Sequence, residues 1–235
     1  MQKQELADTL ERQLRAVKAE RQAAKREPAL LAARNALKRF QAARLARSHA
    51  ALLDAPDTHD AALFFLDELY AAHDLSQRDI DLERIVPTMQ RLLSYEALRT
   101  ITNAIVLDAL SERLDTAMAR ALGPAFSAAD YLRAYRTVTA QDERARQLDL
   151  VQELGESLCA LVKIPLLSAT LSVMRAPARL AGLGELQQFL ERGFHTFRKM
   201  QRRQDFVTAI VARERAVSAA IYAGRDEALE SAWAR

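Results

Sequence analysis

The sequence predicts an all-α fold. Helix-forming Ala, Leu, Arg, Glu and Gln dominate the chain, and only 6 Gly and 6 Pro occur in 235 residues. An all-β chain of this length needs more turn residues, and no stretch sustains the alternation of a strand. Half of the residues are apolar, enough for a sizeable core. We expect an orthogonal bundle of about nine or ten helices, with one main domain and an N-terminal helical hairpin.

The helical hairpin is predicted over residues 1–53. Its first helix, residues 2–26, carries an apolar stripe at helical spacing, formed by Leu6, Leu10, Leu14 and Val17. Pro28 suits the first turn of a second helix over residues 28–52. The remaining chain, residues 54–235, is predicted to form one continuous helical body.

Local signals divide the start of this body. A helix over about 58–72 contains FFLDELY. Ser76 and Asp79 are spaced like the capping box of a helix that starts near residue 77. Pro87 should kink or break this helix near Ile85, because proline lacks the N–H group and clashes with the preceding turn.

The next helix is expected over about 95–121, ending at Gly123-Pro124. Ser127 with Asp130, and then Thr139 with Asp142, are predicted to start two more helices. Pro165, Pro177 and Gly182 should cut the following chain into short segments. The last helices are expected over about 184–201, 203–223 and 225–233.

The least polar stretch runs from Leu158 to Met174 and is interrupted by Lys163 and Pro165. It falls short of the ~20 apolar residues that a membrane-spanning helix needs. We therefore predict that it is a buried core helix.

Charge is unevenly distributed, although the net charge is only +3. The first 50 residues hold 12 Lys or Arg and 5 Asp or Glu, whereas residues 54–83 hold nine acidic side chains opposed only by Arg78. The second helix carries a basic contact face made of Arg34, Lys38, Arg39, Arg44 and Arg47. We favour docking of this face on the acidic segment of the same chain or of a second copy. The alternatives are contact with phosphates of nucleic acid or anionic lipid, and plain solvation of both regions.

A further acidic face is predicted on the helix over 95–121. It consists of Asp108, Glu112 and Asp115. We expect these side chains to form ion pairs with arginines that come later in the chain, namely Arg133, Arg136, Arg144 and Arg146.

Motifs for metal, nucleotide or nucleophilic chemistry are missing from the sequence: it has no HExxH, P-loop, Gly-rich dinucleotide turn or GxSxG. Glu191 and His195 could share a helix face, but a metal needs more ligands. Cys159 lies among apolar residues, which makes a thiol unreactive. As a lone cysteine it fits a reducing compartment, and the N-terminus lacks an apolar signal core. We predict no cofactor, no metal site and a cytoplasmic location.

The densest group of ionisable residues lies between Asp67 and Arg84. Its candidate ligand or interaction residues are Glu68, Tyr70, Asp74, Arg78, Asp79, Glu83 and Arg84. Paired carboxylates beside Tyr and His could serve general acid–base chemistry. Because no nucleophile or cofactor motif accompanies them, we favour an ion-paired junction between two helices and assign no catalytic residue.

Two sequence blocks stand out as a combination. The first block is FFLDELY at 64–70, followed by Asp74, Arg78-Asp79 and ERIVP at 83–87. The second is MRAPA at 174–178, followed by AGL at 181–183 and LQQFLERGF at 186–194. Together they resemble the blocks of the bacterial FFLEELY motif proteins. The resemblance spans roughly residues 60–225 and departs after Tyr70, where Ala71-Ala72 stand in place of a Gly-Pro turn. The family is uncharacterised, so the resemblance implies no catalytic or binding residue.

Three functions follow as hypotheses. The preferred one is a non-catalytic interaction or scaffold protein, a homodimer that uses the basic helix and the acidic segment as contact surfaces. The second is an enzyme or small-ligand carrier with a polar pocket around residues 67–84. The third is association with nucleic acid or an anionic membrane through residues 1–53, which we favour less because Phe40 is the only aromatic residue there.

Overall fold

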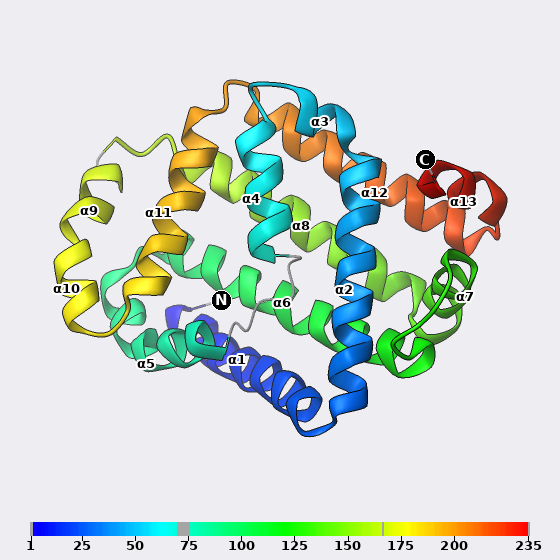
Figure 1. Cartoon of the computed structure of the whole chain (residues 1–235). Coiled ribbons are helices and arrows are strands. Elements are labelled where there is room, and N and C mark those ends of the chain that lie inside the picture. The colour runs from blue at the N-terminus through cyan, green and yellow to red at the C-terminus, as the bar shows by residue number, and fades with distance from the viewer. Residues whose placement is uncertain (1, 70–75, 166, 235) are drawn as a thin grey trace.

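The computed structural model describes residues 2–69, 76–165 and 167–234, and these ranges contain 13 α-helices and no strand. The all-α prediction is confirmed. Two long helices, α6 (Tyr95–Leu122) and α8 (Gln141–Leu161), lie side by side in the middle of the molecule (Figure 1). Several of the other helices pack against this pair at different angles, as in an orthogonal bundle, and others lie at the edges of the molecule.

The two N-terminal helices are integral to the bundle. Helix α1 (Lys3–Arg26) packs along α6 and α5 (Ser76–Leu92), and α2 (Pro28–Ser48) crosses α6 (Figure 1). The predicted stripe of α1 is completely buried: Leu6, Leu10, Leu14 and Val17. Pro28 occupies the first turn of α2, as expected. The second helix ends earlier than predicted, and a short helix α3 (Ala50–Asp54) follows it.

Helix α5 corrects one prediction. It follows α4 (His59–Leu69) and continues through Pro87 to Leu92 instead of breaking near Ile85. Val86 and Met89, on either side of the proline, are buried in a hydrophobic cluster with α1 and α6. We attribute the continuity to this packing, which offsets the missing hydrogen bond of the proline.

Helix starts agree with the sequence at α7 and differ at α8. At α7 (Ala128–Val138), Ser127 and Asp130 form the predicted capping box. Helix α8 has Ala140 as its N-cap residue, so the prediction of a Thr139 cap is wrong. The Thr139 hydroxyl donates to the carbonyl of Tyr135 instead, which closes the preceding helix.

The stretch from Leu158 to Met174 is not one buried helix. Helix α8 ends at Leu161, and the short helices α9 (Leu167–Val173) and α10 (Arg175–Leu180) follow. Val173 is 73% exposed and Met174 46%. Pro165 lies in the break between α8 and α9, where a continuous helix would lose a backbone hydrogen bond.

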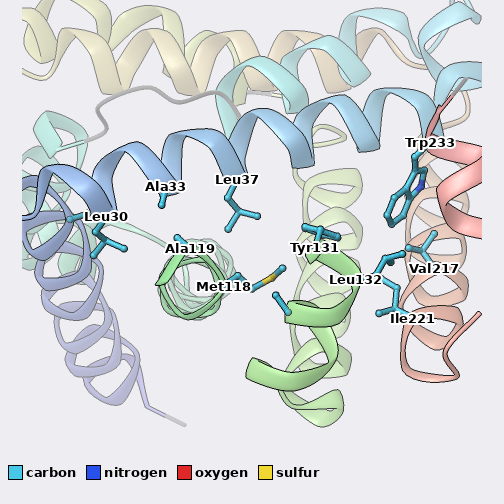
Figure 2. Packing of buried hydrophobic residues seen from close by; sticks show 12 residues of the cluster. Leu30, Ala33, Leu37, Met118, Ala119, Tyr131, Leu132, Val217, Ile221 and Trp233 are labelled. Atoms are coloured by element: carbon cyan, nitrogen blue, oxygen red, sulfur yellow. The ribbon is translucent and has the colours of Figure 1, made fainter. Parts of the chain in front are cut away.

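Three helices complete the chain: α11 (Gly184–Lys199), α12 (Arg203–Tyr222) and α13 (Asp226–Ala234). Their buried residues contribute to three hydrophobic clusters. Figure 2 shows the first, in which Leu30, Ala33 and Leu37 of α2 point toward Met118 and Ala119 of α6. The second joins α1, α5 and α6, and the third joins α4, α8, α11 and α12. Among the described residues, no helix is long and apolar enough to cross a membrane.

Candidate functional site

A buried group of charges lies where α1, α2, α5 and α6 meet. Arg21 of α1 is 8% exposed and forms an ion pair with Asp79 of α5, which is 1% exposed. The same guanidinium lies 2.9 Å from a carboxylate oxygen of Asp108 and 3.3 Å from Glu112, both on α6. Asp79 therefore helps to fix α5 against α1 through a buried charge.

Glu112 is the centre of this group. Arg34 and Lys38 of α2 both form ion pairs with it, Lys38 at 3.2 Å. Arg34 also donates to the hydroxyl of Thr116 at 3.0 Å. Burial removes both cations from water, and this desolvation lowers their pKa.

The acidic face of α6 has partners other than those predicted. Its carboxylates meet side chains of α1 and α2, because α6 turns this face toward the N-terminal helices. The later arginines are engaged elsewhere: Arg133 with Asp130, Arg136 with Asp226, Arg144 with Gln147 and Met118, and Arg146 with Glu153.

The basic contact face of α2 is divided between the interior and the surface. Arg34 and Arg44 are buried, and Lys38 is mostly so, whereas Arg39 and Arg47 are exposed. The ion pairs of the inward-pointing residues lead to α6 and to Glu214 of α12. Within the chain these cations therefore have other partners than the predicted acidic segment 54–83, because α2 packs across α6. Docking of α2 on a second copy stays a prediction.

Part of the acidic segment pairs with another basic region. The carboxylate of Asp57 accepts backbone hydrogen bonds from Gln201 at 2.8 Å and Arg202 at 3.2 Å, and these bonds lower the pKa of Asp57. Asp60 lies 3.4 Å from the ammonium of Lys199. The carboxylates thus fasten the connection between α11 and α12.

The candidate residues of the first sequence block are partly described. Glu83 pairs with Lys18 of α1, next to the pair of Asp79 with Arg21. Glu68 and Arg78 belong to α4 and α5, but their side chains are outside what the structure describes. Tyr70 and Asp74 lie outside the described residues.

Arg84 connects the first sequence block to the second. Its guanidinium donates to the carbonyl of Ala181, at the end of α10, and lies 3.7 Å from Asp81. Gly182 follows with φ of 73°, and the N–H of Leu183 donates to the carbonyl of Ala178 at 2.7 Å. This is a Schellman turn, and a positive φ explains the glycine.

The aromatic residues of FFLDELY have structural roles. Phe64 faces α11, where a Cβ at position 193 would lie only 3.0 Å from its ring, so Gly193 permits the approach. The Phe64 ring centroid also lies 5.6 Å from that of Phe189. Phe65 packs on Phe206, with ring centroids 6.0 Å apart. The two sequence blocks therefore form one packed unit of α4, α5, α10 and α11.

Polar contacts hold α9 and α10 on α11. The Arg175 Nε lies 2.8 Å from both carboxylate oxygens of Glu191, which lowers the pKa of Glu191. The Gln187 amide donates to the carbonyl of Leu171 at 2.7 Å. A surface hollow lies here and is lined by Arg175, Arg179, Gln187 and Glu191. The α9–α10 segment is thus fixed by Glu191, Gln187 and Arg84.

This segment presents large apolar side chains to solvent. Leu180 is 91% exposed and Val173 73%, with Met174 and the cations Arg175 and Arg179 beside them in sequence. We call these five residues the α9–α10 ridge. The apolar content of residues 158–174 predicted burial, whereas Val173 and Met174 are exposed. The predicted breaks at Pro165 and Pro177 were the signal against one continuous core helix.

The described residues contain no group of three or more His, Cys, Asp or Glu that could hold a metal ion. Burial raises the pKa of the Cys159 thiol, which reduces its nucleophilicity at neutral pH. Asp79 and Glu83 face cations rather than a described hollow, so their arrangement stabilises helix packing.

The comparisons with known proteins give a family and no activity. No curated protein and no solved structure matches the chain. A family model that carries the description Domain of unknown function matches residues 20–228, most of the chain. The chain therefore belongs to the family Domain of unknown function (DUF8198).

Proposed function

We propose that this protein is a non-catalytic interaction protein whose contact surface is the α9–α10 ridge. The observation that carries the proposal is the exposure of Leu180 and Val173 on a segment fixed by Arg84, Arg175 and Gln187. Large apolar side chains held in water on an ordered backbone typically mark an interaction site. The partner is anionic, because Arg179, the exposed cation of the ridge outside the Arg175–Glu191 pair, attracts negative charge.

The other hypotheses have less support. A pocket around residues 67–84 would use Asp79 and Glu83, which are paired with cations of α1. Association through the N-terminal helices would use α2, whose Arg34, Lys38 and Arg44 are engaged inside the chain. An isologous homodimer through the ridge would bring like charges together.

The proposed family and location come from the sequence. From the two sequence blocks we also propose that the chain is one of the bacterial FFLEELY motif proteins. The lone Cys159 favours the cytoplasm.

Cysteine labelling in a lysate of the native cells tests whether a partner covers the ridge. On a Cys159→Ala background, Leu180→Cys supplies a single exposed thiol. Its rate of maleimide modification is measured in a gentle whole lysate and in the purified protein. We expect slower modification in the lysate, because a bound partner shields the thiol.

Val138→Cys on the same background is the matched control. Val138 is exposed on α7, at the opposite end of the molecule from α10 (Figure 1). Its modification rate should be the same in lysate and in purified protein. Equal rates in both settings for Leu180→Cys would contradict the proposed function.

A further inference from the structure

We infer that the α9–α10 ridge docks on an anionic lipid bilayer surface, where its apolar side chains enter the headgroup region. This inference rests on the proposed function and names the partner of the same surface. It differs from the sequence hypothesis, which placed membrane contact on the N-terminal helices. The ridge combines cations with apolar side chains, Leu180 and Val173, that are far more exposed than Leu31 of α2 at 38%.

The charge around the ridge is positive. Between residues 157 and 184 the chain carries Lys163, Arg175 and Arg179 and no acidic residue. Of the two acids that follow on α11, Glu191 is bound to Arg175, and this pair carries no net charge. What remains is two cations, Lys163 and Arg179, against one acid, Glu185. Each basic side chain near an anionic bilayer attracts the protein electrostatically, and this attraction acts within about a Debye length.

The exposed apolar side chains of the ridge belong to two short helices at one edge of the molecule. Leu180 and Val173 belong to helices of six and seven residues, at the edge of the molecule that Figure 1 shows on the left. Helices of this length cannot span a bilayer, and they suit an interfacial position. The Schellman turn at Gly182 and the bond from Arg84 to Ala181 hold the end of α10, so insertion needs little additional ordering.

Lipid fits this surface better than nucleic acid. The apolar members of the ridge are Val173, Met174 and Leu180, which are aliphatic or thioether side chains. Single-stranded nucleic acid is bound through aromatic stacking, which these residues cannot provide. Aliphatic side chains beside arginines are typical of segments that lie in the membrane interface.

Vesicle co-sedimentation of the full chain tests the inference. One set of vesicles contains phosphatidylcholine and phosphatidylglycerol in equal parts, and the other contains phosphatidylcholine alone. We expect binding to the anionic vesicles at low ionic strength, weaker binding at about 0.15 M salt, and little binding to the neutral vesicles. Leu180→Ser should weaken binding about tenfold and Arg179→Gln about fivefold.

Two control variants separate the ridge from other surfaces. Val138→Ser removes an exposed apolar side chain from α7, and Arg47→Gln removes an exposed cation from α2. Neither should change binding by more than about twofold. Circular dichroism of each variant checks that the helices remain folded.

The outcomes distinguish the two proposals. No binding to anionic vesicles at low ionic strength overturns the lipid inference. If Leu180→Cys is nevertheless shielded in the lysate, the interaction function stands and the partner is a protein. Binding that depends on Arg47 and not on Leu180 also overturns the inference, because α2 is then the membrane contact. Equal binding to neutral vesicles overturns the role of the cations.

Discussion

Glu214 on α12 should be a main source of acid sensitivity in this fold. Its two carboxylate oxygens accept hydrogen bonds from Arg44 at 3.1 and 2.7 Å, and the Nε2 of His49 lies 2.9 Å from one of them. Burial would by itself raise the pKa of Glu214. The charge of Arg44 and the hydrogen bonds from His49 and Arg44 outweigh burial and hold the pKa at about 2.

The size of the effect follows from this pKa. The folded value of about 2 lies below the ordinary 4.5, so folding favours the charged form. The difference corresponds to about 3 kcal/mol of stability, since each pKa unit is worth about 1.4 kcal/mol. This contribution is fully present above the ordinary pKa and is lost as the pH falls from about 5 toward 2.

Glu214→Gln is the informative substitution, because it keeps the shape of the side chain and removes the titration. Unfolding by urea is followed by circular dichroism at pH 7 and at about pH 3. We expect the variant to be less stable at pH 7 by about 3 kcal/mol or more, and the difference from wild type to shrink by about 2 kcal/mol at the lower pH.

The matched control is Asp149→Asn, which removes one partner of a half-exposed pair with Arg215. Such pairs contribute about 0–1 kcal/mol, so this variant should resemble wild type at both pH values. A stability difference for Glu214→Gln that is the same at pH 7 and pH 3 would refute the reasoning, because the carboxylate would then contribute nothing that depends on its charge.

Three further substitutions test the packing and are checked by the same urea unfolding. Glu112→Gln should lower the free energy of unfolding by about 3–5 kcal/mol, because it removes the negative charge with which three buried or mostly buried cations pair. A loss below about 1 kcal/mol would contradict the central position of Glu112. Gly155→Ala should cost about 1–3 kcal/mol, since the new Cβ would lie 2.6 Å from a methyl carbon of Val207, whereas Gly184→Ala meets no contact under 3.8 Å and should not destabilise. Ser127→Ala removes the N-cap of α7 and should cost about 0.5–2 kcal/mol.

The helices could largely be predicted from the sequence, because their ends depend on neighbouring residues. Ser127 and Asp130 form their capping box across three residues, and Gly123 ends α6 with a positive φ. The break predicted as one outcome at Pro87 does not occur, and the local cost of proline is offset by the burial of Val86 and Met89 against other helices. That burial is a tertiary effect, which no local pattern contains.

The charge partners could not be predicted for the same reason. The sequence shows that Glu112 and Asp108 share a helix face, but not which helix will cover that face. Arg21 and Arg34 meet Glu112 from positions 91 and 78 residues earlier in the chain. Because the acidic segment 54–83 is close to α2 in sequence, we predicted that the two would pair. Within the chain α2 instead crosses α6, and cations of α2 pair with Glu112 there.

The α9–α10 ridge shows most clearly what hydropathy can and cannot establish. An apolar segment indicates that its side chains favour an apolar environment, which for residues 158–174 was predicted to be the protein core. The structure instead exposes Val173 and Met174, while Arg175 and Gln187 fix their backbone from the side of α11. Because polar contacts with α11 hold this segment in place, its apolar side chains do not have to be buried to order it. If the proposed bilayer contact is correct, the apolar pattern indicated the right environment, and what it could not indicate was that a partner supplies it.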